Sequence, residues 1–340
     1  MVGRHCFWVG NIYKGQAMAW VQHRFFSVCI SAAFMAGAVS AQTFPNKPLK
    51  FVVGYPPGGS GDFVTRTVGE AIAAELGQTA IIDNRPGAAG NLASEMVLKA
   101  PADGYTLLVG SNPYINKALY KKLPYDIEKD FQPVTLLANG PMIIAVNNNL
   151  PVTSIKDLIT YAKKNPGKLN FASSGNGSAP HLAGVLFNSV SDIDFLHIPF
   201  KGGAPAVQSL IAGDTQVIFG TSPVVLPQAR ANRIRALSIT TQERSGAIPG
   251  IMGMKEAGLG DYNISFSFGL YAPSGVKPEE VKKLFDAATK VLKRSDIRDK
   301  LATQGMDPAP NASPMEFQQM NLKEAPMWEK LVTSSGAKVD

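Results

Sequence analysis

Two hydrophobic periods alternate along the chain. Short apolar runs rich in β-branched and aromatic residues are separated by segments in which apolar residues return every three or four positions. Such alternation is typical of α/β proteins whose sheets are mainly parallel. The predicted strands are Leu49–Tyr55, Ala80–Asp83, Tyr105–Gly110, Met142–Asn147, Leu169–Ser173, Phe195–Pro199, Gln216–Gly220, Ile234–Thr240 and Ser265–Tyr271.

The segments between these strands carry start and stop signals for helices. Helix starts are predicted near Asp62, Ser154, Pro180, Pro278 and Ser313. Ser313 and Glu316 form a capping box before the last helix. We expect Pro326 to kink or break that helix, because proline lacks the backbone N–H that an inner helical position needs.

Four of the predicted strands run into short segments of Gly, Ser, Asn and Pro that precede a helix or turn. These segments are PPGGSGD, GSNPYIN, SGNGSAPHL and GTSPVV. In open α/β sheets, ligands bind outside the carboxyl ends of the strands. The loops near residues 58 and 175 belong to different halves of the chain. We therefore expect them to face each other across a cleft between two lobes.

The first of these loops has the composition of an anion site at the start of a helix. Its small residues expose backbone N–H groups, and the helix dipole adds attraction for negative charge. Ser60 stands where a nucleotide-binding P-loop has lysine, so a small anion such as a carboxylate is favoured over a triphosphate. The alternative is a tight turn capped by Asp62. The candidate ligand-binding residues are Pro57, Gly58, Gly59, Ser60 and Asp62.

The loop after residue 172 repeats this arrangement before a second helix. Its candidate ligand-binding residues are Ser173, Ser174, Gly175, Asn176, Gly177, Ser178 and His181. Ser178 and His181 also have the residue types of a nucleophile and a base. A serine hydrolase needs an orienting third residue and an oxyanion hole, and the chain has no G-x-S-x-G elbow. A serine cap followed by a histidine in the first helical turn is therefore the favoured interpretation.

Other loops add single candidates. Ser111 and Thr221 follow two of the remaining strands, and Lys201 and Gly202 follow another. Lys201 either supplies charge for a second carboxylate or is a solvated turn residue, and the sequence leaves both open. The helix before Gly213 is expected to end at that glycine.

Composition narrows the class of protein. Residues 1–41 resemble a secretory signal peptide with small residues before Gln42, and Met18 is a possible true start. Without them the chain has no cysteine, 30 basic and 26 acidic residues, and a net charge of +4. This charge is scattered, so nucleic-acid binding is not indicated. The only histidines outside residues 1–41 are His181 and His197, and we expect His197 to be a buried strand residue. No metal or cofactor site is predicted. About 300 residues favour two domains.

Several longer stretches resemble one family. They include FPNKPLKFVVGYPPGGSGD, DNRPGAAGNLASEMVLKAPADGYTLLVGS, LNFASSGNGSAPHLAGVLF and IPFKGGAPAVQSLIAGD. The chain is similar, nearly end to end, to the periplasmic solute-binding proteins of tripartite tricarboxylate transporters, the Bug family. The resemblance implies a type II periplasmic-binding-protein fold, with two α/β lobes joined by crossings near residues 141–146 and 265–270. Lobe 1 would comprise residues 42–141 plus 268–340, and lobe 2 residues 142–267.

The resemblance also implies a function. A monomeric periplasmic receptor would hold a small organic carboxylate in the two loops, without catalysis or cofactor, and deliver it to membrane permease subunits. The chain departs from the family pattern after Phe219 and after Ser245, and it has Phe200 where Tyr is common. These departures lie outside the two carboxylate loops. Two other functions stay open: an extracytoplasmic ligand sensor for a two-component system, and a secreted serine hydrolase.

Overall fold

The computed structural model describes residues 43–111 and 114–337. Within it, the described residues from Pro45 onward form one compact unit. The predicted signal peptide, with its possible start at Met18, lies outside the described residues. Among the residues that are described, no helix combines the length and apolar character needed to cross a bilayer.

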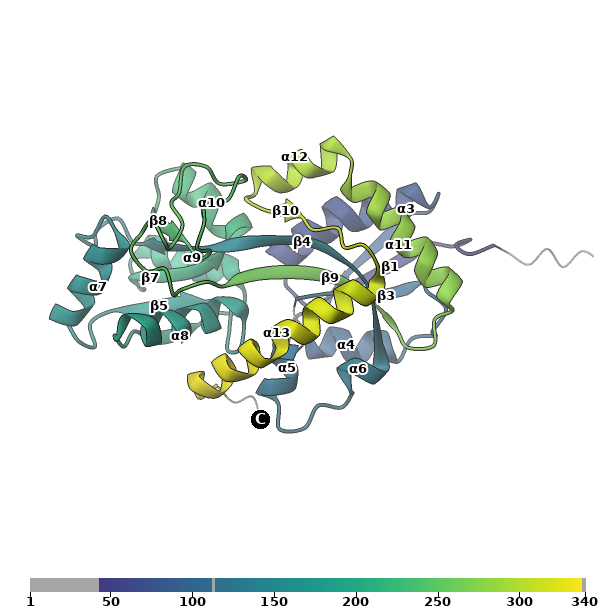
Figure 1. Cartoon of the computed structure of the whole chain (residues 1–340), viewed down its shortest axis with the longest axis horizontal. Helices are drawn as coiled ribbons and strands as arrows, with labels where there is room; N and C mark the ends of the chain where they lie inside the picture. The colour runs from purple at the N-terminus through teal and green to yellow at the C-terminus, as the bar shows by residue number, and fades with distance from the viewer. Residues whose placement is uncertain (1–42, 112–113, 338–340) are drawn as a thin grey trace, which may run out of the picture. The chain divides into compact units, whose positions relative to one another are not determined.

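A single mixed sheet runs through this unit in the order β2-β1-β3-β9-β4-β7-β5-β6, with β8 and β10 also pairing with β4 (Figure 1). The strands are β1 (Leu49–Val53), β2 (Ala80–Asn84), β3 (Thr106–Gly110), β4 (Phe131–Val146), β5 (Asn170–Ser173), β6 (Leu196–Pro199), β7 (Val217–Thr221), β8 (Arg235–Ile239), β9 (Ser265–Pro273) and β10 (Asp307–Pro308). All nine predicted strands are present. The α/β class is confirmed.

The strands at each end of the sheet are parallel to one another. Strand β1 lies parallel between β2 and β3, and β5 lies parallel between β6 and β7. The two long strands β4 and β9 are antiparallel to each other and to their outer neighbours. The chain therefore forms two lobes, one on β1–β3 and one on β5–β7, with β4 and β9 passing between them.

Strand β4 changes partners along its length, and the sequence pattern did not predict its first part. Its residues 131–141 pair with β9, and residues 142–146 pair with β7 and β8. Only the second part was predicted as a strand, because Gly140 and Pro141 interrupt the apolar pattern. Bulges after Pro133 and after Leu136 let the irregular first part stay paired. The expected crossing near residues 141–146 coincides with the change of partner.

Helices cover both faces of the sheet. They are α2 (Ser60–Val64), η1 (Thr65–Gly69), α3 (Glu70–Glu75), η2 (Ala88–Gly90), α4 (Asn91–Leu98), α5 (Tyr114–Leu119), α6 (Ile127–Asp130), α7 (Ile155–Lys164), α8 (Ala179–Ser191), α9 (Gly203–Ala212), α10 (Ser222–Arg230), α11 (Pro278–Leu292), α12 (Ser295–Thr303) and α13 (Pro314–Ser335). The predicted caps at Ser154 and Ser313 accept backbone N–H groups of their first turns, and Gly213 ends α9 in the left-handed conformation.

Of the kink or break expected at Pro326, the break does not occur, because α13 continues through this residue to Ser335. The proline leaves the carbonyl of Leu322 without its usual donor. Leu322 is 43% exposed, so this residue lies on the side of α13 that faces water. The helix remains anchored by buried Phe317, Trp328 and Leu331.

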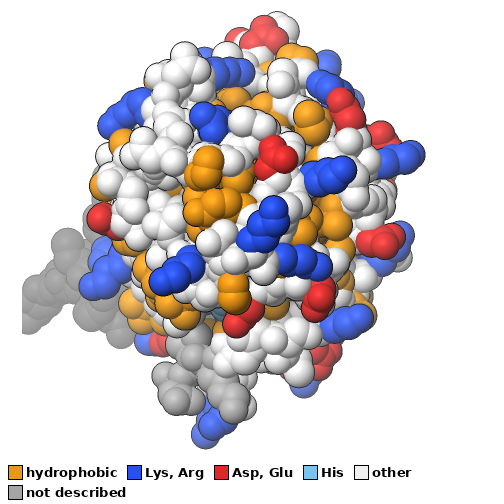
Figure 2. Space-filling model, turned by 90° about the vertical axis from the view of Figure 1, so that its left-hand side faces the viewer, with side chains coloured by type: hydrophobic (Ala, Val, Ile, Leu, Met, Phe, Trp, Pro, Cys, Tyr) orange, Lys and Arg blue, Asp and Glu red, His pale blue; other side chains and the backbone are white. Residues whose placement is uncertain are grey.

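Each lobe has its own apolar cluster. In the lobe on β5–β7, Ile143, Leu210 and Ile218 belong to one buried group. In the lobe on β1–β3, the buried group includes Val52 and Phe317. Because the two clusters are separate, the strand ends between them are free to line a cavity. On the face shown in Figure 2, Lys and Arg side chains are scattered among acidic ones without a continuous basic patch.

Candidate ligand-binding site

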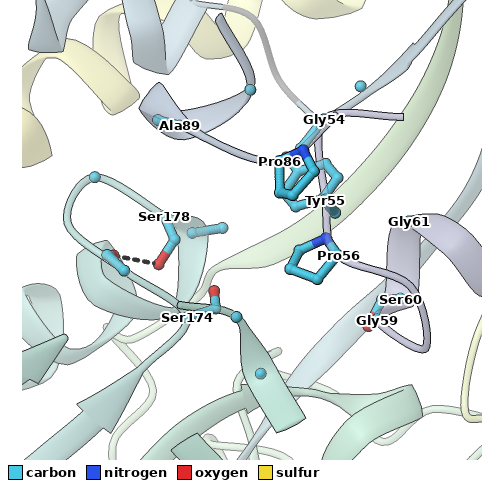
Figure 3. A pocket seen from close by; sticks show the side chains of 18 of the residues that line it. Gly54, Tyr55, Pro56, Gly59, Ser60, Gly61, Pro86, Ala89, Ser174 and Ser178 are labelled. Atoms are coloured by element: carbon cyan, nitrogen blue, oxygen red, sulfur yellow. Dashed lines mark hydrogen bonds between the residues drawn. The ribbon is translucent and has the colours of Figure 1, made fainter. Parts of the chain in front are cut away.

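One cavity of about 800 Å³ lies where the strand ends of the two lobes meet (Figure 3). The segments that follow β1, β2 and β3 line one side of it, and those that follow β5, β6 and β7 line the other. Residues of β9 complete the wall. The expected cleft between two α/β lobes is therefore present at the carboxyl ends of the parallel strands.

The cavity is surrounded by helix N-termini. Five lining residues are the N-caps of α2, α4, α8, α9 and α10: Gly59, Gly90, Ser178, Gly202 and Thr221. Helix N-termini carry unpaired N–H groups and partial positive charge. Among the described lining residues Lys201 is the only charged side chain. The site can therefore neutralise a small anion largely through backbone dipoles.

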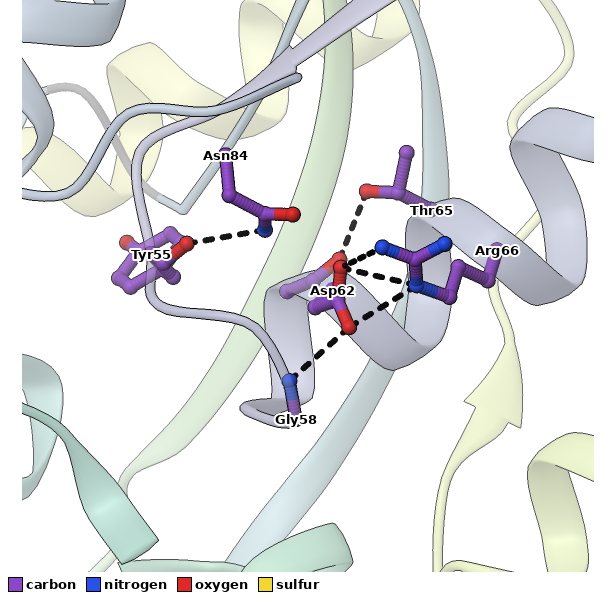
Figure 4. A network of polar contacts seen from close by, with 7 residues as sticks. Tyr55, Gly58, Asp62, Thr65, Arg66 and Asn84 are labelled. Atoms are coloured by element: carbon purple, nitrogen blue, oxygen red, sulfur yellow. Dashed lines mark hydrogen bonds and ion pairs between the residues drawn. The ribbon is translucent and has the colours of Figure 1, made fainter. Parts of the chain in front are cut away.

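The loop after β1 is held in shape from behind, away from the cavity (Figure 4). The Asp62 carboxylate accepts the backbone N–H of Gly58 at 2.9 Å and the Arg66 guanidinium at 3.0 Å. The hydroxyl of Thr65 donates to the carbonyl of Gly61 at 2.7 Å. Burial alone raises the pKa of Asp62, but the bonds from Arg66 and Gly58 outweigh it, so the pKa lies below its ordinary value. Asp62 thus shapes the loop as an anion.

Of the residues predicted in this loop, Gly59 and Ser60 line the cavity, together with Gly61. Pro57, Gly58 and Asp62 do not line it. The backbone N–H groups of Ser60 and Gly61 precede the first intrahelical bond, and none of the described residues accepts from them. These two N–H groups are available to an anion.

The loop after β5 is supported by the residues beneath it. Ser173 bonds His197 Nε2 at 2.6 Å and accepts the backbone N–H of Gly175 at 3.2 Å. The Ser178 hydroxyl donates to the Gly175 carbonyl at 2.7 Å. The predicted residues Ser174, Gly175, Asn176, Gly177 and Ser178 line the cavity, whereas Ser173 and His181 do not.

The two histidines stack face to face below this loop, with ring centroids 3.9 Å apart. His181 is buried and accepts the backbone N–H of Gly177 through Nδ1 at 3.1 Å. His197 is half-buried rather than buried as expected, because β6 is the edge strand of the sheet. Burial lowers the pKa of His181 to about 4. Burial and the neighbouring His181 lower the pKa of His197 to about 3.

This geometry does not pair Ser178 with His181 as nucleophile and base. The Ser178 hydroxyl caps α8 by accepting the backbone N–H of His181, and Nδ1 of His181 is occupied by Gly177. The predicted serine cap is confirmed, and the hydrolase hypothesis gains no support. Within the described ranges, no three His, Cys, Asp or Glu side chains are grouped to hold a metal ion.

The two lobes touch directly across the cavity. The hydroxyls of Ser60 and Thr221 lie 2.7 Å apart. A β-carbon on Gly202 would lie 3.2 Å from Cγ of Pro56, and one on Gly177 would lie 2.1 Å from Cδ1 of Leu119. The structure is therefore a closed arrangement in which these glycines let the lobes approach. The predicted Ser111, Lys201, Gly202 and Thr221 all line the cavity.

Two groups stand out among the lining residues that were not predicted. The first is the segment 86–90 after β2, in which φ is positive at four consecutive residues: Gly87, Ala88, Ala89 and Gly90. The signal was its PGAAG composition after a strand. The second is the aromatic group Phe266, Phe268 and Tyr271 on β9. The alternation of Phe266 and Phe268 places them on one face of a strand, which was the available signal.

Comparison with known proteins agrees with this geometry. Residues 64–336 match the family described as the tripartite tricarboxylate transporter family receptor, TctC. The chain is similar to Protein BugT of Bordetella pertussis, with 32% identity over 92% of this chain and 96% of that protein.

Two solved structures are also similar. Rpa4515 of R. palustris, solved with adipate, has a TM-score of 0.81 and 33% identity, covering 86% of this chain and 98% of that chain. MatC of Rhodopseudomonas palustris, solved with bound malate, has a TM-score of 0.78 and 32% identity, covering 85% and 100%. The family match covers most of the chain, and the cavity at the strand ends agrees with it. The chain therefore belongs to the TctC family of tripartite tricarboxylate transporter receptors.

Proposed function

We propose that this receptor binds a small organic carboxylate in the cavity between its lobes. The convergence of five helix N-termini and Lys201 on one closed cavity carries the proposal. No carboxylate side chain is among the described lining residues, so nothing there repels an anion. Adipate and malate in the similar structures support the same ligand class.

The carboxylate would be held chiefly by the two loops that the sequence singled out. The free N–H groups of Ser60 and Gly61 would donate from one lobe, and Ser174 and the 175–178 backbone from the other. A ligand held by both lobes stabilises the closed form, because the open form cannot make both sets of contacts. The Ser60–Thr221 contact would favour the same form.

The wider biological role follows from this binding mode. Residues 1–41 would direct the chain to the periplasm, and lobes of residues 42–141 plus 268–340 and of residues 142–267 would close on the ligand. The loaded receptor, as a monomer and without a cofactor, would then deliver its ligand to the permease subunits of a tripartite transporter.

A matched pair of glycine variants tests the binding proposal. Gly59→Asp adds negative charge at the N-cap of the first loop, and its β-carbon would lie 3.2 Å from the carbonyl of Pro56. Gly246→Asp adds the same charge at an exposed site with nothing within 4 Å. Titration calorimetry with a carboxylate identified by thermal-shift screening should show binding lost in Gly59→Asp and retained in Gly246→Asp. Equal affinity in both would overturn the assignment of this loop.

A further inference from the structure

The chain contains two Asn-Gly pairs, Asn139-Gly140 and Asn176-Gly177. In such a pair the backbone nitrogen of the glycine can attack the side-chain amide carbon of the asparagine, because glycine has no side chain to hinder the approach. The C–N bond of the amide breaks, ammonia leaves, and a five-membered succinimide ring forms. Water then opens the ring and leaves aspartate or isoaspartate in place of asparagine.

The surroundings of Asn139 oppose this reaction. Its side chain is exposed, as is that of Asn176, so exposure alone does not separate the two pairs. Asn139 lies within β4, where it pairs with Ser267 of β9 on one side and with Asp307 of β10 on the other. Ring closure requires the asparagine backbone to rotate out of the extended conformation, which would break these backbone hydrogen bonds. The sheet therefore protects Asn139.

Asn176 lies instead in a turn between two glycines. The φ angle is +128° at Gly175 and +72° at Gly177. Among the described residues, none forms a hydrogen bond with the Asn176 side chain. Neither strand pairing nor a side-chain contact therefore holds the amide carbon of Asn176 away from the Gly177 nitrogen.

The Gly177 nitrogen has a proton acceptor beside it. Its N–H donates to Nδ1 of His181 at 3.1 Å, and His181 is buried. Burial lowers the pKa of His181, so the imidazole is neutral in neutral solution and Nδ1 keeps its lone pair. Loss of the N–H proton makes the nitrogen nucleophilic, and the imidazolium can pass that proton to the departing ammonia. His181 can thus serve both proton transfers of ring closure.

We propose that Asn176 is a site of spontaneous deamidation through a succinimide, with His181 as the proton acceptor for the Gly177 nitrogen. Asn176 lines the cavity, where Lys201 is the only charged side chain among the described lining residues. A carboxylate at this position would repel a bound anion, so the receptor would lose affinity as it ages. That consequence rests on the proposed carboxylate-binding function, whereas the modification itself does not.

Peptide mapping by mass spectrometry tests the modification, after incubation of the protein in neutral buffer made with H₂¹⁸O. Asn139 is the matched control within the same molecule. We expect deamidation with uptake of ¹⁸O to be at least about tenfold faster at Asn176 than at Asn139. Equal rates at the two sites, or no reaction at Asn176, would overturn the proposal.

Two variants test the role of the histidine. His181→Phe keeps a ring against His197 and removes Nδ1, whereas His197→Phe leaves Nδ1 of His181 in place. Deamidation at Asn176 should be at least about threefold slower in His181→Phe and close to the parent rate in His197→Phe. An unchanged or faster rate in His181→Phe would overturn the role of His181. Slow reaction at Asn139 in each variant controls for an intact fold.

Titration calorimetry with adipate and malate tests the consequence for binding. Asn176→Asp should weaken the affinity for the acid that the parent protein binds by about tenfold or more. Asn139→Asp adds the same charge at a residue that does not line the cavity, and it should bind like the parent. Parent-like affinity in Asn176→Asp would overturn the expected loss of binding. Absence of binding by the parent would count against the proposed function and not against the deamidation.

Discussion

Acidification should weaken the fold through the stacked histidines His181 and His197. Both histidines form hydrogen bonds with the loop above them. His181 accepts the backbone N–H of Gly177, and Nε2 of His197 bonds the hydroxyl of Ser173. The pKa of His181 is about 4 and that of His197 about 3, both lowered first by burial. The folded protein therefore keeps this pair neutral in mildly acidic solution, whereas the unfolded chain does not.

The sign and size of the effect follow from this difference. In the unfolded chain a histidine takes up its proton as the pH falls through about 6.5. The folded His181 does so only near pH 4, so its stabilisation is complete above pH 6.5 and is lost between 6.5 and 4. At 1.36 kcal/mol for each pH unit, the total is roughly 3 kcal/mol, of which about 2 kcal/mol is lost by pH 5. The contribution of His197 does not simply add to this total, because part of its lowered pKa comes from the neighbouring His181 and the two protonations are coupled.

Urea unfolding between pH 7.5 and pH 5 measures this loss. The pKa of Asp62 and that of Asp83 are lowered, so these carboxylates remain ionised across the window. We expect the free energy of unfolding to fall by at least 2 kcal/mol and Tm by about 2–4 °C for each kcal/mol. The double variant His181→Phe, His197→Phe keeps two stacked rings and should show little pH dependence there. The same slope in the variant and the parent would refute this account, because the stacked histidines would then not be the source of the pH dependence.

Three further predictions concern closure and charge at the cavity. Thr221→Val removes the hydroxyl that meets Ser60, so calorimetry should show about fivefold weaker ligand binding, and unchanged affinity would argue against an interlobe contact that favours closure. Gly177→Ala places a β-carbon 2.1 Å from Cδ1 of Leu119, at a residue whose φ is +72°. Ligand affinity should therefore fall more than about tenfold, while Tm falls by only a few degrees. A variant that is as stable as the parent and binds as tightly would contradict the closed geometry. Lys201→Gln should slow ligand association in stopped-flow measurements at low salt by about 3- to 10-fold, with the difference shrinking at high salt; a salt-independent effect would assign Lys201 a role other than attraction.

The sequence was most informative where a local rule acts alone. The helix cap at Ser178 depends on one side chain and the turn beside it, and it was predicted correctly. The two glycine-rich loops were recognised because a strand end, small residues and a helix start are consecutive in the chain. Their placement at one cavity followed from the rule that ligands bind at the carboxyl ends of parallel strands.

Sequence reasoning was less successful where distant contacts override a local preference. The first part of β4 reads as broken at Gly140 and Pro141, yet pairing with β9 holds it extended. Pro326 was expected to kink or break the last helix, yet α13 continues through it, with Trp328 and Leu331 buried on the next turns. In both cases tertiary packing outweighs the unfavourable local residue.

The sequence by itself determined the α/β class, the family resemblance and the two loops that supply backbone N–H groups, since each depends on residues close together in the chain. Only the tertiary structure decided that Asp62 and His181 support these loops from behind, that Ser60 meets Thr221 across the lobes, and that Tyr55 and Phe268 flank Gly61. Those contacts join residues far apart in sequence or depend on the direction in which a side chain points. Both are set by how the strands pair and the helices pack, which local patterns do not specify.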